Sequence, residues 1–179
     1  MAATTLDGRH ARRTSNRESV IDALVTLFAE GSYFPSSNDI AERAGISSRS
    51  LFRYFDDVDD LVRAAIVRQL AAIQPYLSSE PVPIDAFVAA RVEMHERTGA
   101  MARAARLFAS RNPVIATKLR QVRAALRTQA IACFGTEAAP AVDALCSFES
   151  YELLRSTHGM SNARTAAALR AAVAAIVGR

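Results

Sequence analysis

The residues best suited to chemistry with a charged partner lie between Ser48 and Leu61, in the stretch SRSLFRYFDDVDDL. Its first half combines arginine with aromatic side chains. That combination is typical of a surface that contacts an anion, because guanidinium groups pair with anions and stack on rings. Its second half places four aspartates within five positions, and these would repel the same anion. The surrounding elements must therefore separate the two halves.

The rest of the sequence predicts an all-α protein of about nine helices, because apolar residues recur every three or four positions and strand signals are weak. A first apolar stripe contains Val20, Leu24, Leu27 and Phe28 and ends at Gly31. The segment 78–83, SSEPVP, is the clearest linker. Five helices are expected beyond it, near 84–97, 100–110, 113–134, 138–157 and 162–177, separated at Gly99, Asn112–Pro113, Gly135 with Pro140, and Gly159.

Two short helices joined by a glycine turn are expected just before the charged stretch. Ser36 can cap the first of them, and Asp39 follows at capping-box spacing. Gly45 permits a positive φ in the turn, and Ser47 caps the second helix. This arrangement is a helix-turn-helix, whose second helix enters the DNA major groove with its N-terminal residues at the base edges.

The segment LFAEGSYFPSSNDIAERAGISSRSLFRYF resembles the TetR family of transcriptional regulators, over about residues 17–61. The resemblance implies a flexible basic arm at 1–16, a three-helix DNA-binding domain at 17–56, and a ligand-binding and dimerisation domain at 57–179, with a linking helix at 57–75. It also implies a homodimer on a palindromic double-stranded DNA operator, and a repressor that a small molecule releases. The effector, the operator and the choice between repression and activation stay open.

The resemblance carries a DNA-contacting role to particular residues. Arg49 is expected to contact guanine, because its fork matches O6 and N7. Tyr54 can donate its hydroxyl to phosphate, and Phe52 stands where the family usually has tyrosine. Phe55 is expected in the core. The full expected DNA face is Ser36, Ser37, Asn38, Ser48, Arg49, Ser50, Phe52, Arg53 and Tyr54. Capping explains the first serine as well, and Arg53 also fits an ordinary solvated arginine.

The polar arm before the first helix offers further cations to DNA. Arg9, Arg12 and Arg13 lie in RHARRTSNR, which contains no acid. Such arms fold into the minor groove or along phosphates. A disordered solubilising tail is the alternative.

The aspartates mark a departure from the family pattern, which usually has serine, lysine and glutamate there. The position of the phosphate-binding lysine is Val58. Aspartates suit the first turn of a helix, because they interact well with its dipole. Four carboxylates could also bind a divalent cation, but the spacing lacks the glycine and distal glutamate of a calcium loop. No metal or cofactor is expected, and it stays open whether Val58 and its neighbours weaken DNA binding.

The second part of the chain is expected to enclose an effector pocket. The candidate lining residues are Phe87, Met94, His95, Met101, Phe108, Phe148 and Tyr151, for which plain core is the alternative. Glu149 and Glu152 would orient a ligand or form exposed salt bridges. The segment 103–127 contains seven basic residues and no acid, which could attract an anionic effector.

The last helix is expected to form the dimer interface. Leu169, Val173 and Ile176 form a stripe, and the many alanines beside them leave room for close helix approach.

Composition narrows the function classes. The net charge is +4, but residues 1–68 carry nine arginines and ten acids, so DNA binding rests on pattern rather than on net charge. No nucleophile elbow, phosphate loop or ligand cluster supports an enzyme. Two cysteines, a polar start and no long apolar run favour a cytoplasmic protein without a membrane span. The remaining alternative is a regulator with a weakened DNA face that acts through a protein partner.

Overall fold

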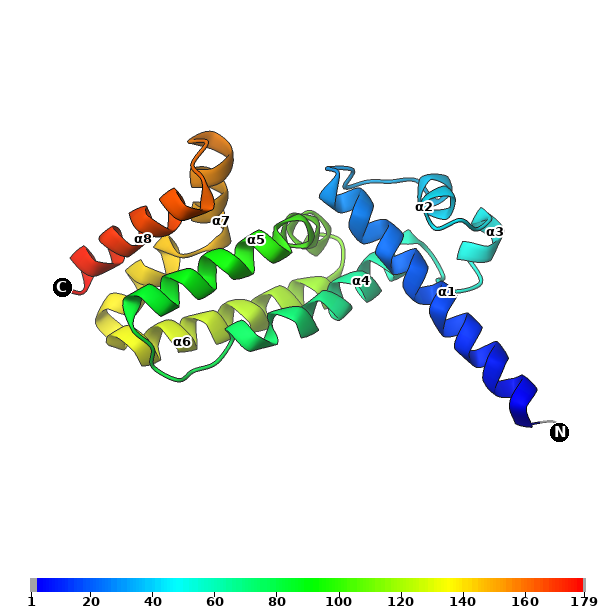
Figure 1. The fold of residues 1–179 in the computed structure, drawn as a ribbon, viewed down its shortest axis with the longest axis horizontal. Helices are drawn as coiled ribbons and strands as arrows, with labels where there is room; N and C mark the ends of the chain where they lie inside the picture. Colours follow the sequence, from blue (N-terminus) through cyan, green and yellow to red (C-terminus); the bar gives the residue numbers. More distant parts are fainter. Residues whose placement is uncertain (1–2, 179) are drawn as a thin grey trace. The chain divides into compact units, whose positions relative to one another are not determined.

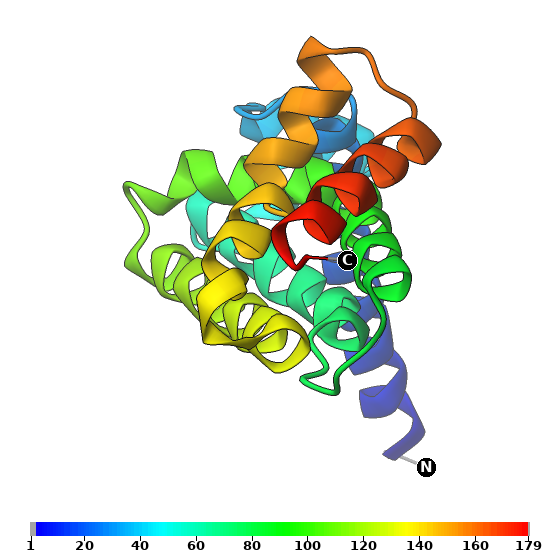
Figure 2. The ribbon, with the colours of Figure 1, turned by 90° about the vertical axis from the view of Figure 1, so that its left-hand side faces the viewer.

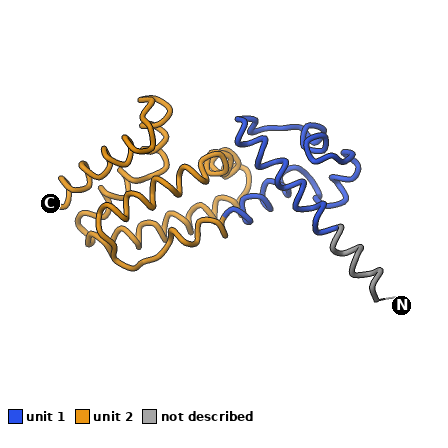
Figure 3. The backbone as a smooth tube through the Cα atoms, viewed as in Figure 1, with its two compact units in different colours: residues 1–69 blue, residues 70–179 orange. Residues whose placement is uncertain are grey.

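The structure is a computed structural model that describes the backbone of residues 3–178 and the side chains of residues 13–178. The described residues form helices and connecting turns, without a strand, so the predicted all-α class is confirmed. Two compact units divide the chain, Met1–Gln69 and Leu70–Arg179 (Figure 3). The division falls inside the helix that the sequence predicts at 57–75 as the link between the two domains.

Unit 1 contains three helices and most of a fourth, built on a long first helix (Figure 1). The expected apolar stripe of that helix is buried, and so are Ile40, Leu51, Phe55 and Leu61 from the elements that follow. The elements are α1 Ala3–Ala29, α2 Ser37–Arg43, α3 Ser48–Leu51 and most of α4 Val58–Ile73.

The signals that begin and end α2 are those expected from the sequence. Ser36 Oγ accepts the Asp39 N–H at 3.2 Å, and Asp39 Oδ2 accepts the Ser36 N–H at 2.9 Å, which completes a capping box. Gly45 has φ 68°, and the Ile46 N–H bonds to the Ala41 carbonyl at 3.0 Å. This is the hydrogen bond of a Schellman motif, which ends α2 and reverses the chain toward α3.

The second helix of the motif is shorter than expected. It was predicted to run through about Tyr54, but α3 ends at Leu51, with Phe52 as its C-cap. The next two residues continue in tighter turns, because the Arg53 N–H bonds to the Ser50 carbonyl at 3.2 Å and the Tyr54 N–H to the Leu51 carbonyl at 2.9 Å. The side chains of residues 52–54 therefore still project from a wound segment.

The helix α1 begins at Ala3, so most of the segment expected as a flexible basic arm lies within α1. The expected linker SSEPVP joins η1 Gln74–Tyr76 to α5 inside unit 2.

Unit 2 packs its helices around one apolar core, with α8 lying against α5 (Figures 1 and 2). The core includes Phe87, Val142, Tyr151, Leu169 and Val173. The elements are α5 Ile84–Ala109, α6 Pro113–Leu145, α7 Phe148–Glu152, the π-helical turn η2 Leu153–Thr157 and α8 Asn162–Ile176.

The two helices expected at 84–97 and 100–110 are one continuous helix, α5. Gly99, expected to separate them, is helical and buried against the Phe148 ring. A Cβ at Gly99 would lie 3.8 Å from Cε2 of Phe148, an ordinary contact. The glycine therefore neither ends the helix nor is required by space.

The break expected at Gly135 is present. Gly135 has φ 75° inside α6, which divides that helix into two halves at a kink. The second half ends at Leu145 rather than 157, and Ser147 then caps α7 by accepting the Ser150 N–H.

Arg91 of α5 holds both halves of the kinked helix. Its guanidinium is 1% exposed and donates to Gln129 Oε1 at 3.2 Å and to the Leu126 carbonyl at 2.7 Å, both before the kink. Asp143 Oδ1, after the kink, lies 3.5 Å from Nη2. Burial lowers the pKa of Arg91, which the Asp143 charge partly opposes. These partners offset the cost of burying the charge at Nε and Nη2, whereas Nη1 is buried without a hydrogen-bond partner among the described residues.

One segment, Pro113–Thr157, is long and apolar enough to cross a membrane by length and composition alone. Its many alanines raise its mean hydropathy, although it contains no long continuous apolar run. The positive φ of Gly135 interrupts this segment, and Ala130 and Val142 pack into the core of unit 2. A core or interface helix of a globular protein meets the same criterion, so the segment is weak evidence for a span.

His95 is a buried titratable group in this core. Its Nε2 lies 3.0 Å from the Cys146 carbonyl oxygen, which fixes the hydrogen on that nitrogen. The rings of Phe148 and Tyr151 lie 5.7 and 5.4 Å away, centroid to centroid. Burial lowers the pKa of His95 to about 4, although the bond to the carbonyl works in the opposite direction.

The neutral state of His95 makes unit 2 sensitive to acid. The folded pKa lies below the unfolded value, so the unfolded chain takes up the proton first as the pH falls. The stability is complete above the unfolded pKa of about 6.5 and is lost toward the folded pKa. From about pH 7.5 to about pH 5.5, we expect the free energy of unfolding to fall by about 1 kcal/mol more in the wild type than in His95→Gln.

Urea denaturation at several pH values measures this difference. Carboxylates titrate mostly below the window. Glutamine keeps an N–H for the Cys146 carbonyl, so the variant isolates the titration. Parallel pH dependences for the two proteins would show that His95 does not take part.

Candidate functional site

The first turns of α2 and α3 meet at a pair of polar side chains. The Ser48 hydroxyl donates to Asn38 Oδ1 at 2.5 Å, which joins the N-terminal ends of the two helices. Asn38 is exposed, and Ser37 is half-buried beside the exposed cap Ser36. These residues, expected on the DNA face, therefore lie together on one surface of unit 1.

Arg49 projects from the first turn of α3. It is exposed and forms no hydrogen bond or ion pair with another described residue. Its neighbour Ser50 is half-buried and accepts a hydrogen bond from the Ser47 hydroxyl at 3.0 Å, next to the backbone cap. Ser50 is therefore held within the motif, and the guanidinium of Arg49 is left to an outside partner.

Tyr54 carries a hydroxyl that other residues orient. Asn16 Nδ2 and Arg53 Nη2 both donate to it, each at 3.1 Å. These two donors lower the pKa of Tyr54, that of Asn16 most. Both lone pairs of the phenol oxygen are occupied, so its own hydrogen must point to a third group. The arrangement fits a hydroxyl that donates to an anion outside the chain.

Asn16 was not expected from the sequence as a functional residue. It lies 38 positions from Tyr54, and nothing in the spacing near Asn16 signals the contact. Arg13, expected as part of the arm, is exposed, and its charge also lowers the pKa of Tyr54. The side chains of Arg9 and Arg12 lie outside the described residues.

The aromatic residues after α3 divide as expected. Phe52 is 49% exposed, so its ring is available to sugar or base. Phe55 is 2% exposed, which confirms its place in the core, and the Arg17 guanidinium lies 4.8 Å from its ring centroid.

The aspartates that follow belong to the start of α4. Asp57 Oδ1 accepts the Asp60 N–H at 2.7 Å, and Asp60 Oδ2 accepts the Asp56 N–H at 3.2 Å. Asp60 also pairs with Arg63, whose bond is the largest cause of a lowered Asp60 pKa. Val58 is the first residue of the helix and is half-buried. The cluster therefore caps a helix, and among the described residues no group of three or more His, Cys, Asp or Glu is placed to hold a metal.

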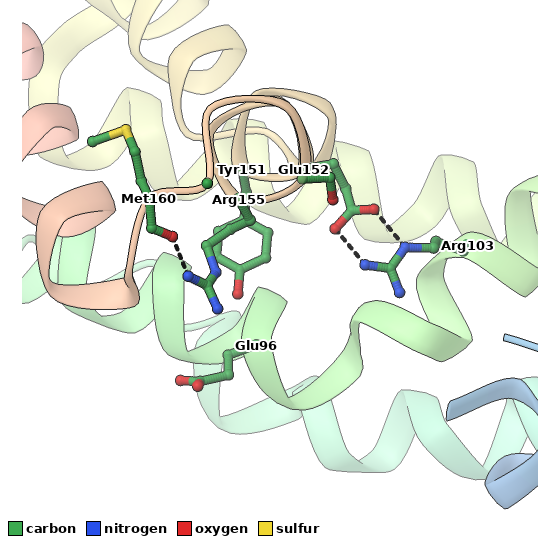
Figure 4. A pocket seen from close by; sticks show the side chains of 8 residues that line it. Glu96, Arg103, Tyr151, Glu152, Arg155 and Met160 are labelled. Carbon is green, nitrogen blue, oxygen red and sulfur yellow. Dashed lines mark hydrogen bonds and ion pairs between the residues drawn. The ribbon is translucent and has the colours of Figure 1, made fainter. Parts of the chain in front are cut away.

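The residues expected to line an effector pocket are packed in the core of unit 2. All seven are buried, with Met101, Phe148 and Tyr151 the most exposed at 5%. A surface pocket of about 360 Å³ lies beside them, and only Tyr151 belongs to both sets (Figure 4). The sequence did not single out Glu96, Arg155 or Met160 as lining residues. They lie on α5, on η2 and in the turn before α8, and these separate elements meet only in the folded chain.

The acids near this pocket form salt bridges, one of the two alternatives left open by the sequence. Glu149 Oε1 lies 2.8 Å from Arg106 Nε and 3.5 Å from Arg123 Nη2. Glu152 pairs with Arg103 through both carboxylate oxygens. The acid-free basic segment is thus partly neutralised by acids of α7, which weakens the argument for an anionic effector there.

The stripe expected at the dimer interface is divided. Leu169 and Val173 are 3% and 0% exposed and pack in the chain's own core, so they are not available to a partner. Ile176 is 39% exposed. The sequence does not show which face of α8 is buried in the chain's own core, because alanines occur on several faces of this helix.

Comparison with known proteins agrees with the geometry. A sequence profile described as "Bacterial regulatory proteins, tetR family" matches residues 20–65. No curated protein sequence matches the chain.

Three solved structures share the fold across nearly the whole chain. GusR of Salmonella enterica is 19% identical, with a TM-score of 0.65, over 92% of this chain and 96% of that one. EbrR, described as a multidrug binding protein complexed with imidazole, is 18% identical, with a TM-score of 0.62, over 90% and 94%. FadR, described as a fatty acid degradation regulator from Bacillus halodurans, is 15% identical, with a TM-score of 0.66, over 88% and 93%.

At these identities the three structures support the fold alone, and the profile carries the family assignment. It covers the last ten residues of α1, the α2–α3 motif and the first half of α4. Residues 20–65 therefore match the N-terminal region of the tetR family of bacterial regulatory proteins, as the sequence resemblance predicts.

Proposed function

We propose that this chain is a DNA-binding transcription regulator, a homodimeric repressor that leaves its operator when a small molecule binds unit 2. The observation that carries the proposal is the start of α3. There Arg49 is exposed and has no partner among the described residues, on a helix whose cap and turn are fully formed. A side chain in this position can reach base edges in the major groove.

Two kinds of contact with DNA are expected around α3, one to bases and one to phosphates. The planar guanidinium of Arg49 can pair with O6 and N7 of a guanine, which gives sequence information. Ser36, Ser37 and Tyr54 suit phosphate oxygens, which fix the register of the protein on the duplex. Arg53 lies 5.2 Å from the Tyr54 ring centroid and donates to its hydroxyl, so its charge accompanies the phosphate donor.

A homodimer is supported by apolar surface left uncovered in unit 2. The apolar window within Pro113–Thr157 is only 22% buried in the chain. Pro140, Ala141 and Ala144 of α6 are exposed. The exposed alanines of α8 at one spacing are Ala168, Ala171 and Ala175. Such small side chains allow two helices from each copy to approach closely and form a four-helix interface.

The release of the repressor by a small molecule is supported by the fold and by one relative. EbrR is described as binding multiple drugs and is complexed with imidazole. Unit 2 of this chain has the same fold and a pocket of about 360 Å³. The identity of the effector is a separate question.

The competing function is a regulator that acts mainly through a protein partner. Its support is the uncharged Val58 at the start of α4, where a lysine would meet phosphate. The neighbouring Asp57 and Asp60 are engaged in capping, so they are explained without such a partner. Fluorescence anisotropy with the DNA upstream of the protein's own gene separates the two. Absence of sequence-specific binding at low salt would favour the partner.

Arg49 tests the DNA face directly. Arg49→Ala is expected to weaken binding to the operator by about 1–3 kcal/mol, roughly 5- to 150-fold, because one bidentate base contact is lost. Binding to unrelated DNA should change much less. Arg127→Ala, an exposed arginine of unit 2, is the matched control. Equal losses on operator and unrelated DNA would mean that Arg49 contacts only phosphate.

Asn16 is expected to act through Tyr54. Asn16→Ala removes one of the two donors that orient the Tyr54 hydroxyl, and should weaken DNA binding by about 0.5–1.5 kcal/mol. Tyr54→Phe should cost at least as much. The double variant should be no weaker than Tyr54→Phe alone, because both changes remove the same contact. Additive losses in anisotropy titrations would indicate that Asn16 contacts DNA independently.

Ala171 tests the dimer. Ala171→Glu places a carboxylate on the exposed alanine face of α8, and burying that charge unpaired costs about 3 kcal/mol or more. Sedimentation velocity should show a dimer for the wild type and a shift toward monomer for the variant. Ala124→Glu on α6 is the control, because Ala124 is also exposed on a helix. A monomeric wild type at micromolar concentration would contradict the proposal.

A further inference from the structure

The surface pocket of unit 2 is lined by two cations and two anions, and one of each, Arg155 and Glu96, forms no ion pair with another described residue. Its residues come from α5, α7, η2 and the turn before α8 (Figure 4). Arg103 and Glu152 satisfy each other through a two-bond ion pair. Arg155 donates to the Met160 carbonyl and makes no ion pair, and Glu96 has no polar partner among the described residues.

The wall that carries Arg155 is fixed by several hydrogen bonds. The π-helical turn Leu153–Thr157 is followed by Gly159 at φ 61°, a conformation that favours glycine. The Met160 N–H bonds to the Leu154 carbonyl at 3.0 Å, and the Arg155 side chain closes the same turn. Turns of this kind inside helices are frequent at functional sites.

The floor of the pocket is also held in place. The Tyr151 ring is 5% exposed, and its hydroxyl donates to Asn162 Oδ1 at 3.1 Å. Met160 adds a thioether side chain at the rim. The lining is thus mostly polar, with four charged side chains, and Tyr151 and Met160 supply its apolar surface. Such a lining suits a small polar ligand whose orientation is fixed by a few charged groups.

The charges decide which kind of ligand fits. Arg103 and Glu152 cancel, so Arg155 and Glu96 leave the lining with no net charge. A simple anion would pair with Arg155 but meet repulsion from Glu96, and a simple cation would meet the reverse. A zwitterion satisfies both, because its carboxylate can take the fork of Arg155 while its ammonium faces Glu96.

We infer that this pocket binds a free amino acid, with its carboxylate on Arg155, its ammonium on Glu96, and its side chain toward Tyr151 and Met160. Arg155 is already oriented by the Met160 carbonyl and retains most of its five N–H donors. The role of such a ligand as effector rests on the proposed function. Its binding does not.

Isothermal titration calorimetry on the full chain tests the site with L-leucine as the probe. N-acetyl-L-leucine lacks the ammonium, and L-leucinamide lacks the carboxylate. Each is expected to bind roughly tenfold or more weakly than L-leucine, because one charge-assisted contact is missing. Equal binding of all three, or no binding of L-leucine, would overturn the inference.

Single substitutions test which residue contacts the ammonium and which contacts the carboxylate of the amino acid. Glu96→Gln should weaken L-leucine roughly tenfold or more but leave N-acetyl-L-leucine unchanged or tighter. Arg155→Gln should weaken both compounds, and Arg155→Lys, which keeps the charge, should retain part of the affinity. Glu137→Gln and Arg127→Gln are controls at exposed positions outside the pocket lining. Circular dichroism verifies folding, and a Glu96→Gln protein that binds L-leucine as the wild type does would contradict the assignment.

The same titration in the presence of labelled operator separates the site from its role. Release of DNA by L-leucine, lost in Glu96→Gln, supports both the pocket and the regulator. Specific binding of L-leucine without any effect on DNA supports the pocket and counts against its role as the effector site.

Discussion

The DNA-binding surface depends on the constraint that α3 has only four residues. A helix of that length is not stable in water, because nucleation costs more than so few hydrogen bonds return. Its conformation is therefore imposed from outside. Gly45 reverses the chain at φ 68°, Ser47 accepts the Ser50 N–H, and Leu51 is 0% exposed at the other end. Arg49 obtains a defined direction only because these three constraints act together.

The helices of unit 2 are held in place by buried polar contacts. Its longest helix is kinked at Gly135, and Arg91 of α5 contacts both halves of that helix. The cost of burying a guanidinium is offset by a carbonyl, an amide oxygen and a carboxylate. The neutral His95 in the same core bonds to the Cys146 carbonyl at the end of the second half. Polar contacts in the interior therefore hold the two halves of α6 together across the bend at Gly135 and anchor the end of α6 before α7 begins.

Sequence alone predicted what depends on neighbours along the chain. The capping box at Ser36, the turn at Gly45 and the break at Gly135 are local, because each is determined by residues within one turn. The continuity of α5 through Gly99 was missed, because helix packing outweighs the low helix propensity of glycine. The Asn16–Tyr54 contact and the burial of Leu169 depend on which helix faces meet. No spacing within one segment encodes that choice, so the positioning residue and the available dimer face had to come from the structure.

The charge of the first part of the chain shows why placement matters more than totals. Residues 1–68 carry one more acid than arginine, and this count alone argues against DNA binding.

Several of these acids, however, form ion pairs with arginines away from α3. Glu30 holds Arg43 at 2.7 Å, Asp22 holds Arg68 at 2.7 Å, and Asp60 pairs with Arg63. Among the described residues, the arginines without an ion pair to an acid include Arg13, Arg49 and Arg53. Arg53 donates to the Tyr54 hydroxyl, and the charge of Arg13 also lowers the pKa of Tyr54. The acids thus pair with arginines away from α3, and the arginines near Tyr54 are left for an outside partner. The aspartates after Phe55 fit the same arrangement, because Asp57 and Asp60 are engaged with backbone N–H groups at the start of α4.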